Sequence, residues 1–298
     1  MSLTMSLPAH IPVLVGEVVE GLQAQPEGYF VDCTLGAGGH TAAILARISP
    51  RGKVLGIDAD PEAIEIAQAR LGGYSESLIF INDNFANLEA ICRRHDFYPV
   101  DGILFDLGVS SMQLDAAKRG FSFKHDAPLD MRFDPNQELT ASGIVNTSSE
   151  LELAHIIKEY GEDIFSWHIA RHIVRNRPIT STLQLAQVVE QALGGRRTRI
   201  HPATRTFMAL RIAVNSELEN IKLALGQAVN LLRSGGRMVV ISYHSLEDRI
   251  IKRFMRHAAS GYTPSLKLIS RKVIKPTSLE IKSNPRSRSA KMRIAERL

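Results

Sequence analysis

Short apolar runs alternate with helical patterns along the first third of the chain. Four runs rich in β-branched and aromatic residues have the length of buried strands: 29–31, 53–57, 78–81 and 100–106. Between them, apolar residues recur every three or four positions, as on one face of a helix. This alternation predicts an α/β fold with a doubly wound parallel sheet.

The next strand-like run, 237–242, comes much later than a strand crossover requires. The intervening chain shows helical patterns at 150–160, 163–176 and 183–193 and no convincing strand. We therefore predict a sheet domain in two parts, with an α-helical insert between them. The expected boundaries are 1–111, 112–200 and 201–298.

The second part of the sheet domain has its own patterns. Eight apolar residues from Phe207 to Leu232 are spaced three or four apart, which predicts one helix of about eight turns. A further helix is expected over 246–257. Apolar segments at 266–269 and 292–295 predict a hairpin that closes the sheet.

Glycines cluster directly after the first predicted strand, at Gly36, Gly38 and Gly39. A strand, a glycine turn and a helix form the first unit of a nucleotide-binding sheet, because glycine lets the backbone approach a ligand. Asp58 ends the second strand, where a carboxylate accepts the hydroxyl protons of a ribose. A purely structural glycine turn is the alternative interpretation.

The glycine pattern differs from the dinucleotide fingerprint at one position. Thr41 stands where G-x-G-x-x-G needs its third glycine, the residue that lets helix and strand pack closely around a pyrophosphate. The pattern therefore favours S-adenosylmethionine, an adenosine cofactor without phosphates, over a nicotinamide dinucleotide.

Polar residues also follow the third and fourth strands. In a doubly wound sheet ligands lie at the carboxyl ends of the strands, so the turn at 82–85 is expected beside adenine, with Phe85 stacking on it. Asp106 ends the fourth strand. Methyl transfer to an exocyclic amine needs acceptors for the N–H protons, and Asp106 is suited to that role. A carboxylate that merely caps a turn is the alternative.

The run 243–248 (YHSLED) places several reactive side chains just after the strand 237–242. A Ser-His-Asp triad is disfavoured, because no G-x-S-x-G elbow is present and adjacent residues rarely orient as a triad. His244 is the favoured functional residue, whereas Ser245 is also a candidate helix cap. His168 and His172 have metal-like spacing but no evident third ligand, so no metal site is predicted.

Composition narrows the class of protein. The chain has 298 residues, 44% of them hydrophobic, and only two cysteines, Cys33 and Cys92. No disulfide framework is expected, which fits a reducing cytoplasm. Neither a membrane-spanning run nor a secretory leader is apparent.

Charge is unevenly distributed. The net charge is +5, but residues 271–298 hold nine Lys/Arg against two Glu and leave the rest of the chain at −2. A basic end on a near-neutral body predicts a polyanion partner, with a solvated tail as the alternative. A second basic cluster could flank a nucleic-acid path. It comprises Arg196, Arg197, Arg199, Arg205 and Arg211.

Eight motifs, in order along the chain, resemble the bacterial 16S ribosomal RNA cytosine N4-methyltransferase family (RsmH, or MraW). The resemblance runs from about residue 10 to residue 298. The motifs are 35–40 (LGAGGH), 101–111 (DGILFDLGVSS), 119–123 (RGFSF), 129–132 (LDMR), 201–207 (HPATRTF), 214–219 (VNSELE), 244–249 (HSLEDR) and 284–289 (NPRSRS).

This resemblance implies a class I S-adenosylmethionine-dependent methyltransferase, with a Rossmann-like doubly wound sheet and an α-helical insert. It implies methylation of the exocyclic N4 of one cytidine in the decoding region of 16S rRNA, within the small ribosomal subunit. The family's cofactor positions fall on Gly38, Gly39, His40, Asp58, Phe85, Asp106 and Gln113.

Catalysis is expected from Asp106, assisted by Ser110 and His244. The chain departs from the D/N-P-P-Y signature of other amino-methyltransferases, so base stacking must come from elsewhere. Phe121, Phe123 and Tyr243 are candidates for stacking. The expected substrate contacts are Asp130, Arg132, Arg205, Asn215 and Ser245.

Two other functions remain open at this point. A nicotinamide-dependent oxidoreductase would also use Asp58, and an RNA-binding assembly factor would keep the basic clusters without catalysis. The sequence allows a monomer or a homodimer, and a direct or indirect role of Mg²⁺.

Overall fold

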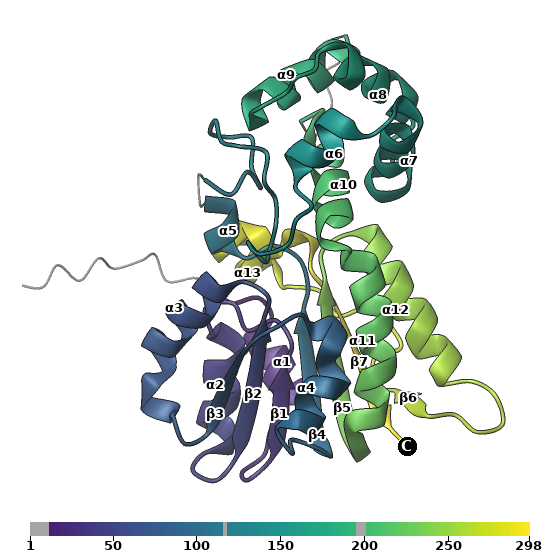
Figure 1. Ribbon diagram of the computed structural model, residues 1–298. Helices are drawn as coiled ribbons and strands as arrows, with labels where there is room; N and C mark the ends of the chain where they lie inside the picture. Colours follow the sequence, from purple (N-terminus) through teal and green to yellow (C-terminus); the bar gives the residue numbers. More distant parts are fainter. Residues whose placement is uncertain (1–11, 116–117, 195–200) are drawn as a thin grey trace, which may run out of the picture. The chain divides into compact units, whose positions relative to one another are not determined.

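The computed structural model describes residues 12–115, 118–194 and 201–298 (Figure 1). The chain divides into two compact units, one of residues 1–108 and 218–298 and the other of residues 109–217. Among the described residues, no helix combines the length and apolar character needed to cross a membrane.

The first unit carries a seven-stranded sheet in the order β3-β2-β1-β4-β5-β7-β6 (Figure 1). β1 to β5 run parallel, whereas β7 is antiparallel to both β5 and β6. The strands are β1 (Tyr29–Asp32), β2 (Lys53–Asp58), β3 (Leu78–Asn82), β4 (Val100–Asp106), β5 (Leu232–Ser242), β6 (Leu266–Leu268) and β7 (Lys291–Arg297). The predicted α/β fold is confirmed.

Helices cover both faces of this sheet (Figure 1). They are α1 (Val15–Gly21), α2 (Gly39–Ile48), α3 (Pro61–Leu71), α4 (Leu88–Arg94), α11 (Glu217–Leu231), α12 (Ser245–Ala258) and α13 (Ser278–Ser283), with 3₁₀ turns η1 (Gly72–Tyr74), η2 (Phe85–Asn87) and η3 (Pro285–Ser289). The predicted pairing of the last two strands is confirmed. Their connection is not a hairpin turn, because it holds α13 and η3.

Alternation of side chains along the strands explains this layering. Phe30, Leu104 and Val239 belong to one buried cluster with residues of α1 and α2. Phe105, the next residue after Leu104, points to the opposite face, where its ring contacts that of Phe85 edge-on at 5.9 Å. Because successive strand residues face opposite sides, nearly continuous apolar runs are what a two-sided sheet requires.

The second unit is helical. Its helices are α5 (Ser111–Asp115), α6 (Ala141–Thr147), α7 (Glu150–Gly161), α8 (Ser166–Arg175), α9 (Thr182–Ala192) and α10 (Thr204–Asn215). The helices predicted over 150–160, 163–176 and 183–193 correspond to α7, α8 and α9. The unit extends beyond the insert expected at 112–200, because α10 contributes to the same core.

The single long helix predicted from Phe207 to Leu232 is wrong. Ser216 adopts a left-handed conformation with φ +49° and separates α10 from α11. The predicted stripe is nevertheless buried on both sides of the break. Phe207 and Leu210 belong to the core of the second unit. The spacing of apolar residues predicts which residues of a helix are buried, but it does not show where a single residue interrupts the helix.

Candidate functional site

The glycine turn after β1 is hydrogen-bonded to Asp58, the last residue of β2. Gly36 and Gly38 have positive φ angles of +51° and +74°, and a Cβ on Gly38 would lie 2.5 Å from Leu71 Cδ1. The Gly36 N–H donates to Asp58 Oδ2 at 2.7 Å, and the Asp60 N–H donates to Asp58 Oδ1 at 2.9 Å. The turn therefore presents bare backbone beside a fixed carboxylate.

Asp106, at the carboxyl end of β4, has three positioned contacts within the first unit. Its N–H donates to Thr34 Oγ1 at 2.7 Å, and Tyr243 donates its O–H to Asp106 Oδ1 at 2.8 Å. The other carboxylate oxygen, Oδ2, lies 3.5 Å from His40 Nδ1. The backbone and side chain of Asp106 are thereby fixed, while 18% of the side chain stays accessible.

His40 is oriented by the segment before α1. Its Nε2 lies 2.8 Å from the Val13 carbonyl oxygen, which can only accept, so Nε2 carries a hydrogen and donates it. This bond directs Nδ1 toward Asp106. The ring is 6% exposed and therefore well shielded from water.

Burial dominates the electrostatics of this edge of the sheet. It raises the pKa of Asp106, against the opposing effects of His40 and of the Tyr243 hydrogen bond. Burial also raises the pKa of Asp32, a neighbouring carboxyl that accepts the Thr41 hydroxyl at 2.7 Å. Burial, reinforced by the charge of Asp106, raises the pKa of Tyr243 far above its ordinary value. Tyr243 therefore stays protonated and remains a donor.

Comparison with known proteins identifies the chain. A sequence model of the MraW methylase family matches residues 8–298. The chain belongs to this family. It is 56% identical to the ribosomal RNA small subunit methyltransferase H of Dehalococcoides mccartyi, over 97% of this chain and 86% of that one. It is 48% identical to the protein of the same name from Thermomicrobium roseum, over 97% of this chain and 94% of that one.

The cofactor of this methylase is S-adenosylmethionine, and the residues of the first unit fit it. The open glycine turn, with Gly38 and Gly39, suits close approach of a ligand to the backbone. Asp58 offers carboxylate lone pairs for ribose hydroxyls, and the half-buried ring of Phe85 offers an apolar face for adenine. When bound, the cofactor supplies a methyl group activated by a sulfonium.

The affinity of this methylase for its cofactor is expected to depend on Asp58 ionisation. Burial raises the pKa of Asp58 to about 6, despite the hydrogen bonds from Asp60 and Gly36. Because only the ionised form offers all its lone pairs, binding should be strongest above pH 6 and about tenfold weaker at pH 5 than at pH 7. Calorimetric titration of S-adenosylmethionine across this range is the measurement.

Asp58→Asn is the control for that titration. It should bind the cofactor more weakly, with little change in affinity between pH 5 and pH 7. A flat profile for the unmodified protein would instead show that Asp58 ionisation does not govern cofactor binding.

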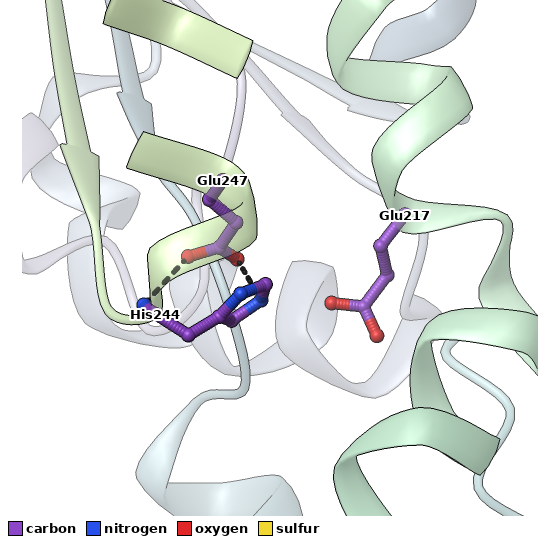
Figure 2. A group of neighbouring side chains, drawn as sticks. All are labelled: Glu217, His244 and Glu247. Atoms are coloured by element: carbon purple, nitrogen blue, oxygen red, sulfur yellow. Dashed lines mark hydrogen bonds and ion pairs between the residues drawn. The ribbon is translucent and has the colours of Figure 1, made fainter. Parts of the chain in front are cut away.

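His244 lies at the same edge of the sheet as Asp106, since β5 runs parallel to β4 with Asp106 opposite Ile241. Figure 2 shows its ring beside Glu247. Its Nε2 lies 3.1 Å from Oε1 of Glu247, which is buried. The other oxygen of Glu247 accepts the N–H groups of Tyr243 at 2.8 Å and His244 at 3.2 Å. Glu247 thus fixes the turn from β5 into α12, and the catalytic role of His244 stays a prediction.

Ser245, the first residue of α12, is exposed. Ser110 and Gln113 lie in the second unit, at the start of α5. The Gln113 side chain accepts the Ser110 N–H at 3.1 Å, and the Ser110 hydroxyl accepts the Gln113 N–H at 3.2 Å. These reciprocal bonds cap a short helix. The cofactor role of Gln113, the catalytic role of Ser110 and the substrate role of Ser245 stay predictions.

Asp130 and Arg132 form a two-point ion pair in a loop of the second unit. Arg132 Nε donates to Asp130 Oδ1 at 2.9 Å and Nη2 donates to Oδ2 at 2.7 Å. Burial alone raises the pKa of Asp130, but the bonds and charge of Arg132 outweigh it and leave the pKa below its ordinary value. Arg132 also donates to the carbonyls of Pro135 and Gln137, so it braces the loop; substrate contact stays a prediction.

Asn215, at the end of α10, is buried and already hydrogen-bonded. Its amide donates to the carbonyls of Met131 at 2.7 Å and Arg211 at 2.9 Å, and its oxygen accepts the Phe133 N–H at 2.7 Å. Arg211 makes a two-point pair with Glu217 at 2.7 and 2.8 Å. Asn215 and Arg211 therefore hold the second unit together, and the substrate contact of Asn215 stays a prediction.

Arg205 is exposed and donates to the Glu162 carbonyl at 3.2 Å, leaving much of its guanidinium accessible. Arg196, Arg197 and Arg199 of the predicted basic cluster lie outside the described residues. His168 and His172 lie on α8 as expected, and His172 Nδ1 lies 2.9 Å from the His168 carbonyl oxygen.

The aromatic candidates for base stacking have partners of their own. Phe121 stacks on Phe133 at 5.5 Å, and Phe123 contacts the rings of His201 at 4.4 Å and Phe207 at 4.8 Å. Their stacking on a base stays a prediction.

Sequence reasoning missed three contributors to the edge that carries Asp106. It did not single out the buried acids Asp32 and Glu247, and it considered Tyr243 only as a stacking ring. The signal for Asp32 was available, because an acid that ends a strand before a glycine turn must be paired if it is buried. The Tyr243 bond to Asp106 joins residues 137 positions apart and left no local signal.

Proposed function

We propose that this methylase transfers a methyl group from S-adenosylmethionine to the exocyclic N4 of one cytidine in the decoding region of 16S rRNA. Its substrate is RNA within the small ribosomal subunit, in the cytoplasm. The relatives' names support a ribosomal RNA substrate. The observation that carries the N4 assignment is Asp106, a positioned carboxylate at the edge of the sheet where the cofactor residues lie.

The chemistry requires such an acceptor. The lone pair of an exocyclic amine is delocalised into the ring and becomes nucleophilic when the N–H groups rotate out of conjugation. An acceptor held beside the amine favours that rotation, because it accepts a hydrogen bond from an N–H group that has left the ring plane. The same acceptor then stabilises the positive charge that develops on the nitrogen during methyl transfer. Asp106 keeps lone pairs for this purpose. Tyr243 contacts only Oδ1 and His40 lies near only Oδ2, and each carboxylate oxygen can accept more than one hydrogen bond.

Further roles in this proposal fall to the other predicted residues. His244 and Ser110 assist Asp106 in holding the amine. Ser245 and the exposed guanidinium of Arg205 contact the RNA backbone, whereas Asp130, Arg132 and Asn215 shape the loop that meets the nucleotide. The target cytidine is extruded from its stack, as enzymes that modify bases generally require.

Tyr243→Phe tests the support of Asp106. A hydrogen bond to a charged group contributes about 1.5–3 kcal/mol, so its loss should raise the pKa of Asp106 and move the acid limb of the pH–rate profile up by about one pH unit. Turnover should fall most on the acid side of the profile, where more of Asp106 is protonated in the variant. Tyr29→Phe, the same change on an exposed ring of β1, should leave the profile unchanged. An unshifted profile for Tyr243→Phe would contradict the proposal.

The decisive experiment is transfer of labelled methyl from S-adenosylmethionine to small subunits that lack the modification. The product nucleoside is then identified by mass. Methyl on N4 of cytidine supports the proposal, and methyl on another atom or base overturns the N4 assignment. Tight cofactor binding without any transfer would favour an RNA-binding assembly factor.

A further inference from the structure

The last fifth of the chain carries the strongest charge in the molecule. Residues 245–298 hold fourteen Lys/Arg and four Asp/Glu, a net charge of +10, while the rest of the chain sums to −5. This part forms α12, β6, α13 and β7, all in the first unit. A concentration of one sign within folded structure, rather than in a tail, points to a surface with a partner.

The few acids of this part are engaged close to the sheet. Asp248 accepts from Arg293 at 2.8 Å and lies 3.6 Å from Lys291. Glu296 pairs with Arg237 at 3.0 Å. Arg237, Lys291 and Arg293 are thereby paired with acids close to the sheet.

Several of these cations surround one hollow between α12, β6 and the segment that follows β6. Lys252, Arg256, Arg271 and Arg293 line it together with Ser270, over the side chains of Met255 and Leu268. The packing of α12 explains the convergence. Ile251 and Met255 are buried, so Lys252 and Arg256, four residues apart, emerge on one side of the helix.

The hollow is electrostatically uncompensated. Asp248 neutralises Arg293, but the side chains of Lys252, Arg256 and Arg271 make no ion pair or hydrogen bond with any residue that the structure describes. Like charges four residues apart destabilise a helix by a few tenths of a kcal/mol. A bound anion would offset this cost.

Ser270 adds a hydrogen-bond donor to the hollow. Its Oγ accepts the Ile294 N–H at 2.9 Å, so the hydroxyl hydrogen is free to point elsewhere. Three cations and one hydroxyl donor match an anion with several exposed oxygens, such as a phosphodiester. A single carboxylate would leave most of these donors unmatched.

We propose that this hollow is a docking subsite for a phosphate of the RNA backbone, separate from the nucleotide that is methylated. The inference rests on the proposed function in taking RNA as the ligand. β6 stands three strands from β4 in the sheet, about 15 Å at the usual strand spacing. The hollow therefore binds RNA outside the catalytic position and leaves cofactor binding untouched.

The test is the double variant Lys252→Gln with Arg256→Gln in the full chain. Its matched control is Arg47→Gln with Lys53→Gln, two exposed cations of the same unit at α2 and β2, several strands away. The probes are a single-stranded RNA oligonucleotide, small subunits lacking the modification, and inorganic phosphate. Binding is measured across salt concentrations, and methyl transfer is measured in parallel.

Loss of the contact with this one phosphate should reduce the slope of log affinity against log salt by about 0.7 for single-stranded RNA. The KM for subunits should rise about tenfold, with turnover at saturation and cofactor affinity within twofold of the unmodified protein. The control variant should leave slope and KM nearly unchanged. Inorganic phosphate should compete with RNA for the unmodified protein only.

Three results would overturn the subsite. One is an unchanged slope and KM for the hollow variant. Another is equal weakening by the control, which would mean diffuse attraction rather than a subsite. The third is phosphate binding at the hollow without any effect on RNA affinity. Because RNA binding is measured independently of methyl transfer, failure of the proposed function does not obscure this outcome.

Discussion

Replacing Asp106 with asparagine is expected to lower the turnover number for methyl transfer about a hundredfold, the scale of losing one positioned proton acceptor. Asparagine has nearly the same shape, and its carbonyl can still accept from Tyr243. It lacks the negative charge that draws the amine protons and stabilises the charge developing on nitrogen. RNA affinity should change little, because this partly accessible side chain offers one contact among many.

The measurement is single-turnover methyl transfer to small subunits lacking the modification, with cofactor affinity determined alongside. The control is Asp101→Asn at the opposite end of β4, where the carboxylate accepts the Tyr29 N–H at 2.7 Å and pairs with Arg233. That variant should keep its turnover. A turnover for Asp106→Asn equal to that of the unmodified protein would remove Asp106 from the mechanism.

Gly120→Ala is expected to cause the largest loss of stability, about 3 kcal/mol or more in the second unit. Gly120 has φ +69°, and a Cβ there would lie 2.2 Å from the Pro128 carbonyl oxygen and 3.1 Å from the Asp130 nitrogen. Both obstacles are backbone atoms, so the loop itself must move. That loop carries the Asp130–Arg132 pair, and its displacement should also weaken RNA binding.

Trp167 is the only tryptophan and lies on α8, so its fluorescence in a urea titration reports the second unit. Gly194→Ala is the matched control: it also has a positive φ, +62°, but its Cβ would meet nothing within 4 Å in the part of the chain that the structure describes. It should cost only the backbone strain of about 1 kcal/mol. Equal losses for the two variants would show that strain, not the clash with Pro128, dominates.

Local patterns in the sequence sufficed for most of the sheet. The strands and helices around β1 to β4 follow from short apolar runs and intervening amphipathic stretches, because a two-sided parallel sheet buries nearly every strand residue. The positions of Gly38, Asp58 and Asp106 follow as well, since each directly ends a strand or begins a helix. The family resemblance, confirmed by comparison, supplied the cofactor and the reaction class.

Long-range contacts were beyond the reach of those patterns. The break at Ser216 depends on one residue's backbone conformation, and the apolar stripe continues through it unchanged. The family resemblance suggested Asn215 only as a substrate contact, whereas the fold hydrogen-bonds both its amide nitrogen and its oxygen within the second unit. The role of such a residue depends on which backbone groups the fold brings next to its side chain. Local sequence patterns do not show which distant groups these are.

The sequence alone thus determined the fold class and the basic character of the C-terminal part, and it predicted the edge of the sheet that binds the cofactor. Only the tertiary structure decided that Tyr243 and His40 hold the two sides of Asp106, and that Lys252, Arg256 and Arg271 meet around one hollow. The physical reason is range. Hydrophobic periodicity can be recognised within a single helix or strand. Hydrogen bonds and charge interactions join side chains from different helices and strands, and these become neighbours only when the chain packs.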